Sequence, residues 1–252
     1  MKRSVLLAMA LALSTCIYSQ RSDDPVFWNT WEYTAKADMR ADFEKAAAEK
    51  TAMFNKTPET AISTYRIITG PDSGSYLRVE GGKTAADYDL DRSAEGAYWN
   101  DNVAKFLAKN GEHVRWRRLN NGSYDPDPEN TTPSKYAQRA FFNVKADKVM
   151  HFRRAMYRIS KVAEKRGWEG RSLYRLVSGG NRHLFMTAAG FDTYKRAASQ
   201  EMETTAEEDY NELFGYGSWD EDWKNFDKAL EYWGEQRDLL QYVPEMSTPM
   251  GN

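Results

Sequence analysis

The sequence KADMRADF, residues 36–43, returns 109 residues later as KADKVMHF, residues 145–152. The similarity continues without a gap, and residues 36–82 match residues 145–191 at 11 of 47 positions. Two of the shared positions are glycines, since Gly70 and Gly81 align with Gly179 and Gly190. A repeat of this length indicates that one folding unit occurs twice in the chain.

Both copies predict the same order of elements: a strand, a helix, two strands, a second helix and a last strand. The first helices begin after Asp38 and Asp147 as N-caps and end at Pro58 and Gly167. In the first copy the strands span residues 27–34, 62–69, 76–80 and 114–119, and the second helix spans 98–110. The corresponding strands of the second copy span 136–144, 172–178, 184–189 and 239–243, and its second helix spans 220–236.

The order β-α-β-β-α-β is that of a ferredoxin-like unit. Two such units in one chain resemble the dimeric α+β barrel superfamily, which includes antibiotic-biosynthesis-monooxygenase-like proteins, haem-degrading monooxygenases and NIPSNAP-like domains. The resemblance implies an α+β fold in which two sheets face each other and one chain supplies both, as a pseudo-dimeric barrel. We therefore expect one repeat at 26–119, a linker at 120–134, a second repeat at 135–245 and a protein that can be monomeric.

The N-terminus predicts export. Lys2 and Arg3 precede an apolar run, residues 4–13, that is too short to span a bilayer, so residues 1–20 are typical of a cleaved signal peptide. This predicts a secreted or periplasmic protein. An alternative is a lipoprotein anchored through Cys16, although Thr15 departs from the small residue that usually precedes a lipidated cysteine. Cys16 is the only cysteine, which excludes an internal disulfide and a thiolate metal site.

The charge balance argues against a nucleic-acid partner. The 252 residues carry 35 basic and 37 acidic side chains, and removal of residues 1–20 leaves 33 basic ones and a net charge of −4. No concentrated basic stripe is present, as nucleic-acid binding would require. No segment after the N-terminal run is apolar enough to predict a transmembrane helix.

Polar side chains are expected on the surface between the two sheets. Because side chains alternate along a strand, Ala140 and Phe142 should face the helices while Arg139 faces the other sheet. The same reasoning places four residues between the sheets: Glu32, Arg66, Arg139 and Arg175. Arg78 and Glu80 are less direct candidates for the same surface. Arginine forks bind carboxylates bidentately, so this set predicts a site for an anionic or oxygen-rich small molecule. Alternatively, the charges pair between the copies, or Arg66 and Arg175 lie in solvent.

Three functions are compatible with these residues. The first is an exported small-molecule-binding protein that needs no cofactor. The second, implied by the resemblance, is a cofactor-independent or haem-dependent monooxygenase, for which Glu32 is the one candidate catalytic residue. The third is a structural or partner-binding protein without a ligand. Haem would require a histidine ligand from His113, His151 or His183, but no histidine or carboxylate spacing matches a metal motif, and we expect solvated histidines and no metal site.

Overall fold

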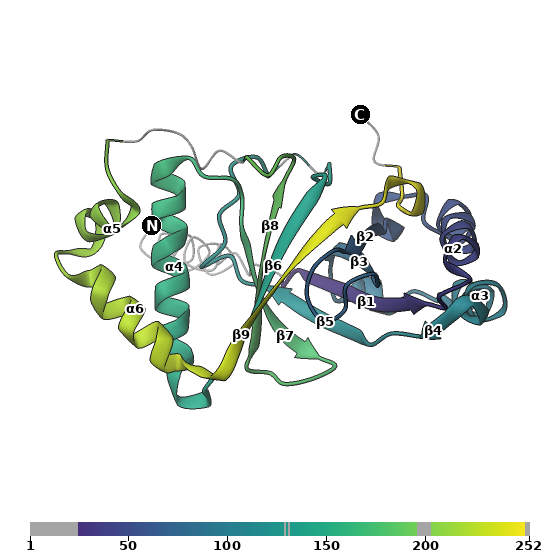
Figure 1. Ribbon diagram of the computed structural model, residues 1–252, viewed down its shortest axis with the longest axis horizontal. Coiled ribbons are helices and arrows are strands. Elements are labelled where there is room, and N and C mark those ends of the chain that lie inside the picture. Colours follow the sequence, from purple (N-terminus) through teal and green to yellow (C-terminus); the bar gives the residue numbers. More distant parts are fainter. Residues whose placement is uncertain (1–24, 129, 131, 196–202, 250–252) are drawn as a thin grey trace, which may run out of the picture.

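The computed structural model describes residues 25–128, 130, 132–195 and 203–249. The predicted signal segment and Cys16 lie outside these ranges. Within them, every helix is too short or too polar to cross a bilayer. Figure 1 shows a central barrel of strands, with the helices of the first copy at one end of the view and those of the second copy at the other.

Each copy contributes four barrel strands and the helices that cover them. The first copy contains β1 (Phe27–Ala35), α2 (Arg40–Phe54), β2 (Ser63–Ile67), β3 (Tyr76–Lys83), α3 (Ser93–Tyr98), a π-helical turn (Trp99–Val103), β4 (Leu107–Lys109) and β5 (His113–Arg118). The second contains β6 (Tyr136–Val144), α4 (Val149–Arg166), β7 (Ser172–Ser178), β8 (Leu184–Phe191), α5 (Ala206–Phe214), α6 (Ser218–Ala229) and β9 (Leu230–Tyr242).

The strands form a closed antiparallel barrel in the order β3-β2-β9-β6-β8-β7-β5-β1, and pairing of β1 with β3 closes it. Within each copy the spatial order is fourth, first, third, second, as in a ferredoxin-like sheet. The two sheets join where β2 pairs with β9 and where β5 pairs with β7. Two tandem ferredoxin-like units thus complete one barrel within one chain, and the predicted fold class is confirmed.

Two apolar layers lie on the two surfaces of the second copy's sheet. On the helix side, Phe142, Phe152, Phe185 and Phe226 form the centre of an aromatic core between the sheet, α4 and α6. On the barrel side, Trp116 and its neighbours from β7 and β8 form a separate cluster. Ala140 and Phe142 belong to the helix-side core, so the predicted orientation of β6 is confirmed.

The helix boundaries differ from the prediction at several points. Met39 and Lys148 occupy the positions before α2 and α4, and neither helix has a side-chain cap, so the predicted capping by Asp38 and Asp147 is wrong. Gly167 does end α4, in the left-handed conformation that favours glycine. The second helix of the first copy ends early, and residues 107–109 form β4 instead.

The predicted helix 220–236 is also too long, because α6 ends at Ala229 and β9 begins at Leu230. Residues 230–236 form a strand instead of a helix because β9 pairs with β6. The register pairs Phe142 with Glu235 and Val144 with Leu230, so β6 advances two residues where β9 advances five. The additional residues of β9 bulge outward, and they include Trp233, which is 80% exposed and has a φ of 54°.

Candidate ligand-binding site

Two of the four predicted site residues meet inside the barrel. The Nη1 atom of Arg139 lies 3.0 Å from the Oε1 atom of Glu32, and its Nη2 atom lies 2.6 Å from a carboxylate oxygen of Asp238. These residues line a cavity of about 400 Å³ at one end of the barrel. Glu32 belongs to the first copy and the other two belong to the second, so the geometry is that of an ion-pair network between the copies.

The other two predicted residues lie on the opposite surface of the sheets. Arg66 is paired in register with Tyr76, which packs in the helix-side core of the first copy, and its Nη2 atom lies 3.4 Å from Gln241. Arg175 is paired with Phe185 of the other helix-side core, and its Nε atom donates to the carbonyl oxygen of Arg182. The prediction that all four face the space between the sheets is therefore wrong for these two arginines.

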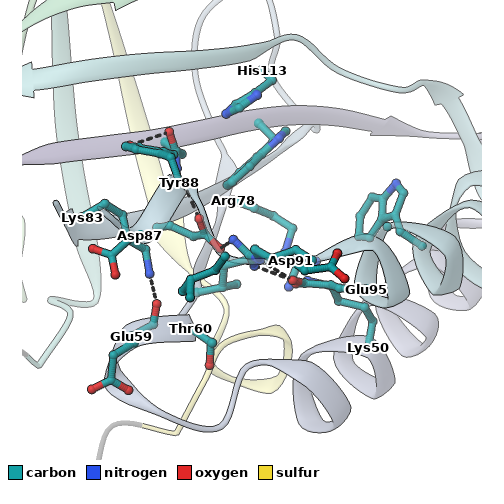
Figure 2. A pocket seen from close by; sticks show the side chains of 18 of the residues that line it. Lys50, Glu59, Thr60, Arg78, Lys83, Asp87, Tyr88, Asp91, Glu95 and His113 are labelled. Atoms are coloured by element: carbon teal, nitrogen blue, oxygen red, sulfur yellow. Dashed lines mark hydrogen bonds and ion pairs between the residues drawn. The ribbon is translucent and has the colours of Figure 1, made fainter. Parts of the chain in front are cut away.

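A larger cavity, of about 610 Å³, lies on the helix side of the first copy. Its floor is the sheet surface of β1 and β3, and its walls come from α2, α3 and residues 84–92. Figure 2 shows charged side chains converging on it from these elements. The charged residues that line it include Lys50, Arg78, Glu80, Lys83, Arg92 and Glu95.

Strand register accounts for the two charged residues on the floor. Antiparallel pairing places Trp31 opposite Arg78 and Asn29 opposite Glu80, and residues directly opposite each other share a face. Trp31 packs against the helix-side core, so Arg78 and Glu80 face the helices as well. The less direct prediction that they lie between the sheets is thus wrong. From the wall, α2 contributes Lys50.

The buried charges of this cavity do not balance. Lys50, Arg78 and Lys83 are each at most 4% exposed, and the side chain of Arg92 is 34% exposed. Two carboxylates face these four cations: Glu80, which is paired with Arg92 at 2.5 Å, and Glu95, which contacts both Arg92 and Lys50. Of the remaining acidic lining residues, Glu59 and Asp91 are exposed, whereas Asp87 is partly buried, as Arg92 is, and forms no ion pair with these cations. The buried and partly buried side chains of the cavity therefore carry an excess of one positive charge.

Arg78 is the least compensated of these cations. Its side chain is 1% exposed, its Nη2 atom contacts the hydroxyl of Thr51, and its guanidinium lies 5.3 Å from the ring centroid of Trp99. The Nε atom has no hydrogen-bond acceptor, and among the described residues no carboxylate forms an ion pair with the guanidinium. Burial lowers the pKa of Arg78 to about 10, against the opposing influence of Tyr33 and the nearby carboxylates. A buried cation in this state is costly for the fold.

Lys50 shares the same environment. Its ammonium contacts Glu95 and donates to the Oδ1 atom of Asn55 at 2.9 Å. Burial, and then the positive charge of Arg78, lower the pKa of Lys50 to about 8, although Glu95 acts in the opposite direction. At neutral pH the cavity therefore holds two close cations, and each disfavours the charge of the other.

The second copy shows that the fold does not require these charges. In the alignment of the copies, Lys50, Arg78 and Glu80 correspond to Ile159, Thr187 and Ala189. There, the space between sheet and helices is filled by the aromatic core described above, with Tyr210 and Trp223 added. The sequence did contain this signal, because three charged residues of one copy align with uncharged residues of the other.

The three histidines do not fit the role of a haem ligand. His151 is exposed on α4, and His183 lies in the turn before β8. His113 lines the mouth of the larger cavity, but its ring is stacked on Trp31 at 4.7 Å, and within the described residues no hydrogen bond orients it, as a metal-bound imidazole requires. Among the described residues no group of three or more histidine or acidic side chains could hold a metal ion.

Known structures with the same arrangement of elements were found, whereas no family model and no curated protein matches the sequence. One, from Lactobacillus acidophilus and provisionally named a monooxygenase, has a TM-score of 0.55 and 12% identity, and the match covers 90% of this chain and 96% of that one. A second, from Fusobacterium nucleatum and named in the same way, has a TM-score of 0.57 and 9% identity, covering 88% and 94%. A chlorite dismutase variant from Candidatus Nitrospira defluvii has a TM-score of 0.52 and 10% identity, covering 87% and 92%.

The chain has the dimeric α+β barrel fold. This statement rests on the closed eight-stranded topology and on matches that span most of both chains. Identities of 9–12% establish the shared fold and nothing about the reaction or ligand.

Proposed function

We propose that this protein binds a small anionic ligand in the 610 Å³ cavity of the first copy. The observation that carries the proposal is Arg78, a fully buried guanidinium without a carboxylate partner among the described residues. A ligand carboxylate would supply the missing charge and accept hydrogen bonds from the guanidinium, which binds such groups bidentately. The cavity volume lies within the range typical of small-molecule sites.

The body of the ligand should be flat and apolar. Trp31, Tyr33 and Trp99 present aromatic rings to the cavity, and Ile62 and Leu90 add aliphatic surface. Aromatic walls favour a planar group because ring stacking adds to the burial of apolar area. An aromatic carboxylate combines such a body with the anion that Arg78 lacks.

Calorimetric titration with a biphenyl monocarboxylate tests the proposal. We expect saturable binding to one site, weakened about tenfold or more by Arg78→Thr, because a charge-assisted hydrogen bond is lost. Thr187 is the residue that the second copy carries at this position, so the substitution is compatible with the fold. Arg175→Thr is the matched control, since it removes an arginine from the helix side of the other sheet.

Two results would contradict the proposal. One is the absence of binding to the folded wild-type protein by this probe and by shorter and longer aromatic carboxylates. The other is equal binding by the wild-type protein and the Arg78→Thr variant. Export is a separate part of the proposal, supported by the composition of residues 1–20. Expression of the full chain in a bacterial host should release a mature form that has lost these residues, as N-terminal sequencing would show.

A catalytic role for Glu32 has less support. The carboxylate is engaged by Arg139 inside the barrel and lines the smaller cavity rather than the larger one. The proposal therefore stops at binding.

A further inference from the structure

Lys83 reaches the cavity because of a β-bulge. The register pairs Phe27 with Lys83 and Asn29 with Glu80, so β3 advances three residues where β1 advances two. The additional residue lies in Gly81-Gly82, and Gly82 has a φ of 68°, which favours glycine. Side chains alternate between the two faces of a regular strand, so Lys83, an odd number of residues from Arg78 and Glu80, would face the barrel. The bulge turns its side chain to the helix side.

Lys83 is a second buried cation without a carboxylate partner. The residue is 4% exposed, and its ammonium donates to the carbonyl oxygen of Glu59, which leaves further N–H groups for other acceptors. In the described part of the chain it forms no ion pair. The carboxylates of Glu59 and Asp87 lie within electrostatic range of the ammonium, but neither contacts it as an ion pair.

The two cations lie apart along β3. Four strand steps separate them once the bulge is allowed for, which places their Cα atoms about 13 Å apart. Figure 2 shows Lys83 with Glu59 and Asp87 at one side of the cavity and Lys50 with Glu95 at the other, with Arg78 between them. Glu80 lies between the two cations along the strand and is paired with Arg92. The negative charge of Glu80 disfavours an anionic group in the middle of the cavity.

We propose that the ligand carries two anionic groups, one at each end of its apolar body, with one bound by Arg78 and the other by Lys83. This inference rests on the proposed function and deepens it: the ligand class is an extended aromatic dicarboxylate or a similar dianion.

The test compares two probes with the same body, the biphenyl monocarboxylate and the biphenyl dicarboxylate with para carboxylates at opposite ends. We expect the dicarboxylate to bind about tenfold or more tightly. Lys83→Met and Lys83→Gln should each abolish this gain, and Lys83→Arg should keep it. Lys45→Met, on the exposed side of α2, is the matched control and should keep it as well.

The results separate the two proposals. A dicarboxylate that binds no more tightly than the monocarboxylate, or a gain that survives both neutral substitutions of Lys83, overturns the dianion inference. The proposed function would then still stand if binding of the monocarboxylate depends on Arg78. If binding of the monocarboxylate does not depend on Arg78, both the proposed function and the dianion inference are overturned, because Arg78 would then bind no anion.

Discussion

The cost of burying a charge depends on what faces it. Arg78 and Arg139 are both at most 5% exposed, yet Arg139 has two carboxylates in contact and Arg78 has none among the described residues. The network around Arg139 stabilises the fold only when all its members are present, whereas the unpaired charge of Arg78 opposes folding. Replacement of each arginine by an apolar residue of similar length should therefore change stability in opposite directions.

Arg78→Met should raise the free energy of unfolding by about 1 kcal/mol, because an unpaired buried cation is removed while packing against Trp99 is kept. Urea denaturation of the ligand-free protein measures this. A decrease in stability would show that Arg78 supports the fold rather than a ligand.

Arg139→Met should lower the free energy of unfolding by about 3 kcal/mol. The substitution leaves Glu32 and Asp238 close together without a cation between them. The same urea experiment applies, and Arg237→Met, which removes a 63% exposed side chain paired with Glu235, is the control. If Arg139→Met were neutral, the network would contribute little to the joining of the copies.

Lys50 should give the cavity a pH signature. Its pKa is lowered to about 8 in the folded state, from 10.5 in an unfolded chain, so between these values the unfolded state binds more protons and stability rises with pH. We expect a gain of about 2 kcal/mol from pH 8 to pH 10 relative to Lys50→Ile, the residue of the second copy. Above about pH 10 the absolute stability of both proteins should fall, because burial raises the pKa of Tyr33 and the unfolded chain ionises first. Equal slopes for both proteins in urea melts would refute this assignment.

At the scale of elements, most strands were predictable because apolar and β-branched residues alternate between clear turn signals. Strands β6 and β7 coincide with their predicted ranges. The face of each strand was harder to predict. In a barrel covered by helices both surfaces are buried, so the sequence has no solvated face that defines which residues point outward. Arg66, Arg175, Arg78 and Glu80 were assigned to the wrong surface for this reason.

The missed site depends on pairings that no local pattern contains. The bulge at Gly81-Gly82 exists only relative to the register of β1 with β3, and it reverses the direction of Lys83. The bulge in β9 likewise depends on β6. Residues 230–236 were predicted as helix because the spacing of apolar residues in α6 continues past Ala229, where strand pairing takes over.

The β9 bulge leads to a stability prediction. A φ of 54° is strained for tryptophan, and Trp233 has little packing to offset it because the side chain is 80% exposed. Trp233→Gly should raise the midpoint of urea denaturation, with a gain of about 1 kcal/mol. Trp233→Ala separates the two causes, since it removes the ring and keeps the strain. A loss of stability in the glycine variant would mean that the ring has contacts worth more than the strain.

At the scale of the molecule, the barrel is closed by strands of one chain. The seams β2–β9 and β5–β7, where two subunits would meet in a dimer of single units, lie within this protein. We therefore propose a monomer in solution. Light scattering after gel filtration should give the mass of one mature chain at every concentration tested, whereas a doubled mass that persists on dilution would show that another surface associates.

The uneven filling of the two copies has an evolutionary consequence. In a dimer of identical subunits, every substitution appears twice, so one half cannot be optimised for packing while the other is hollowed for binding. Joining the halves into one chain removes this constraint. The aromatic core around Phe152 can supply stability for the whole barrel, which leaves the region around Arg78 free to keep buried charge at a cost to folding. Such a division of labour would let the charged pocket change its ligand through successive substitutions without loss of the fold.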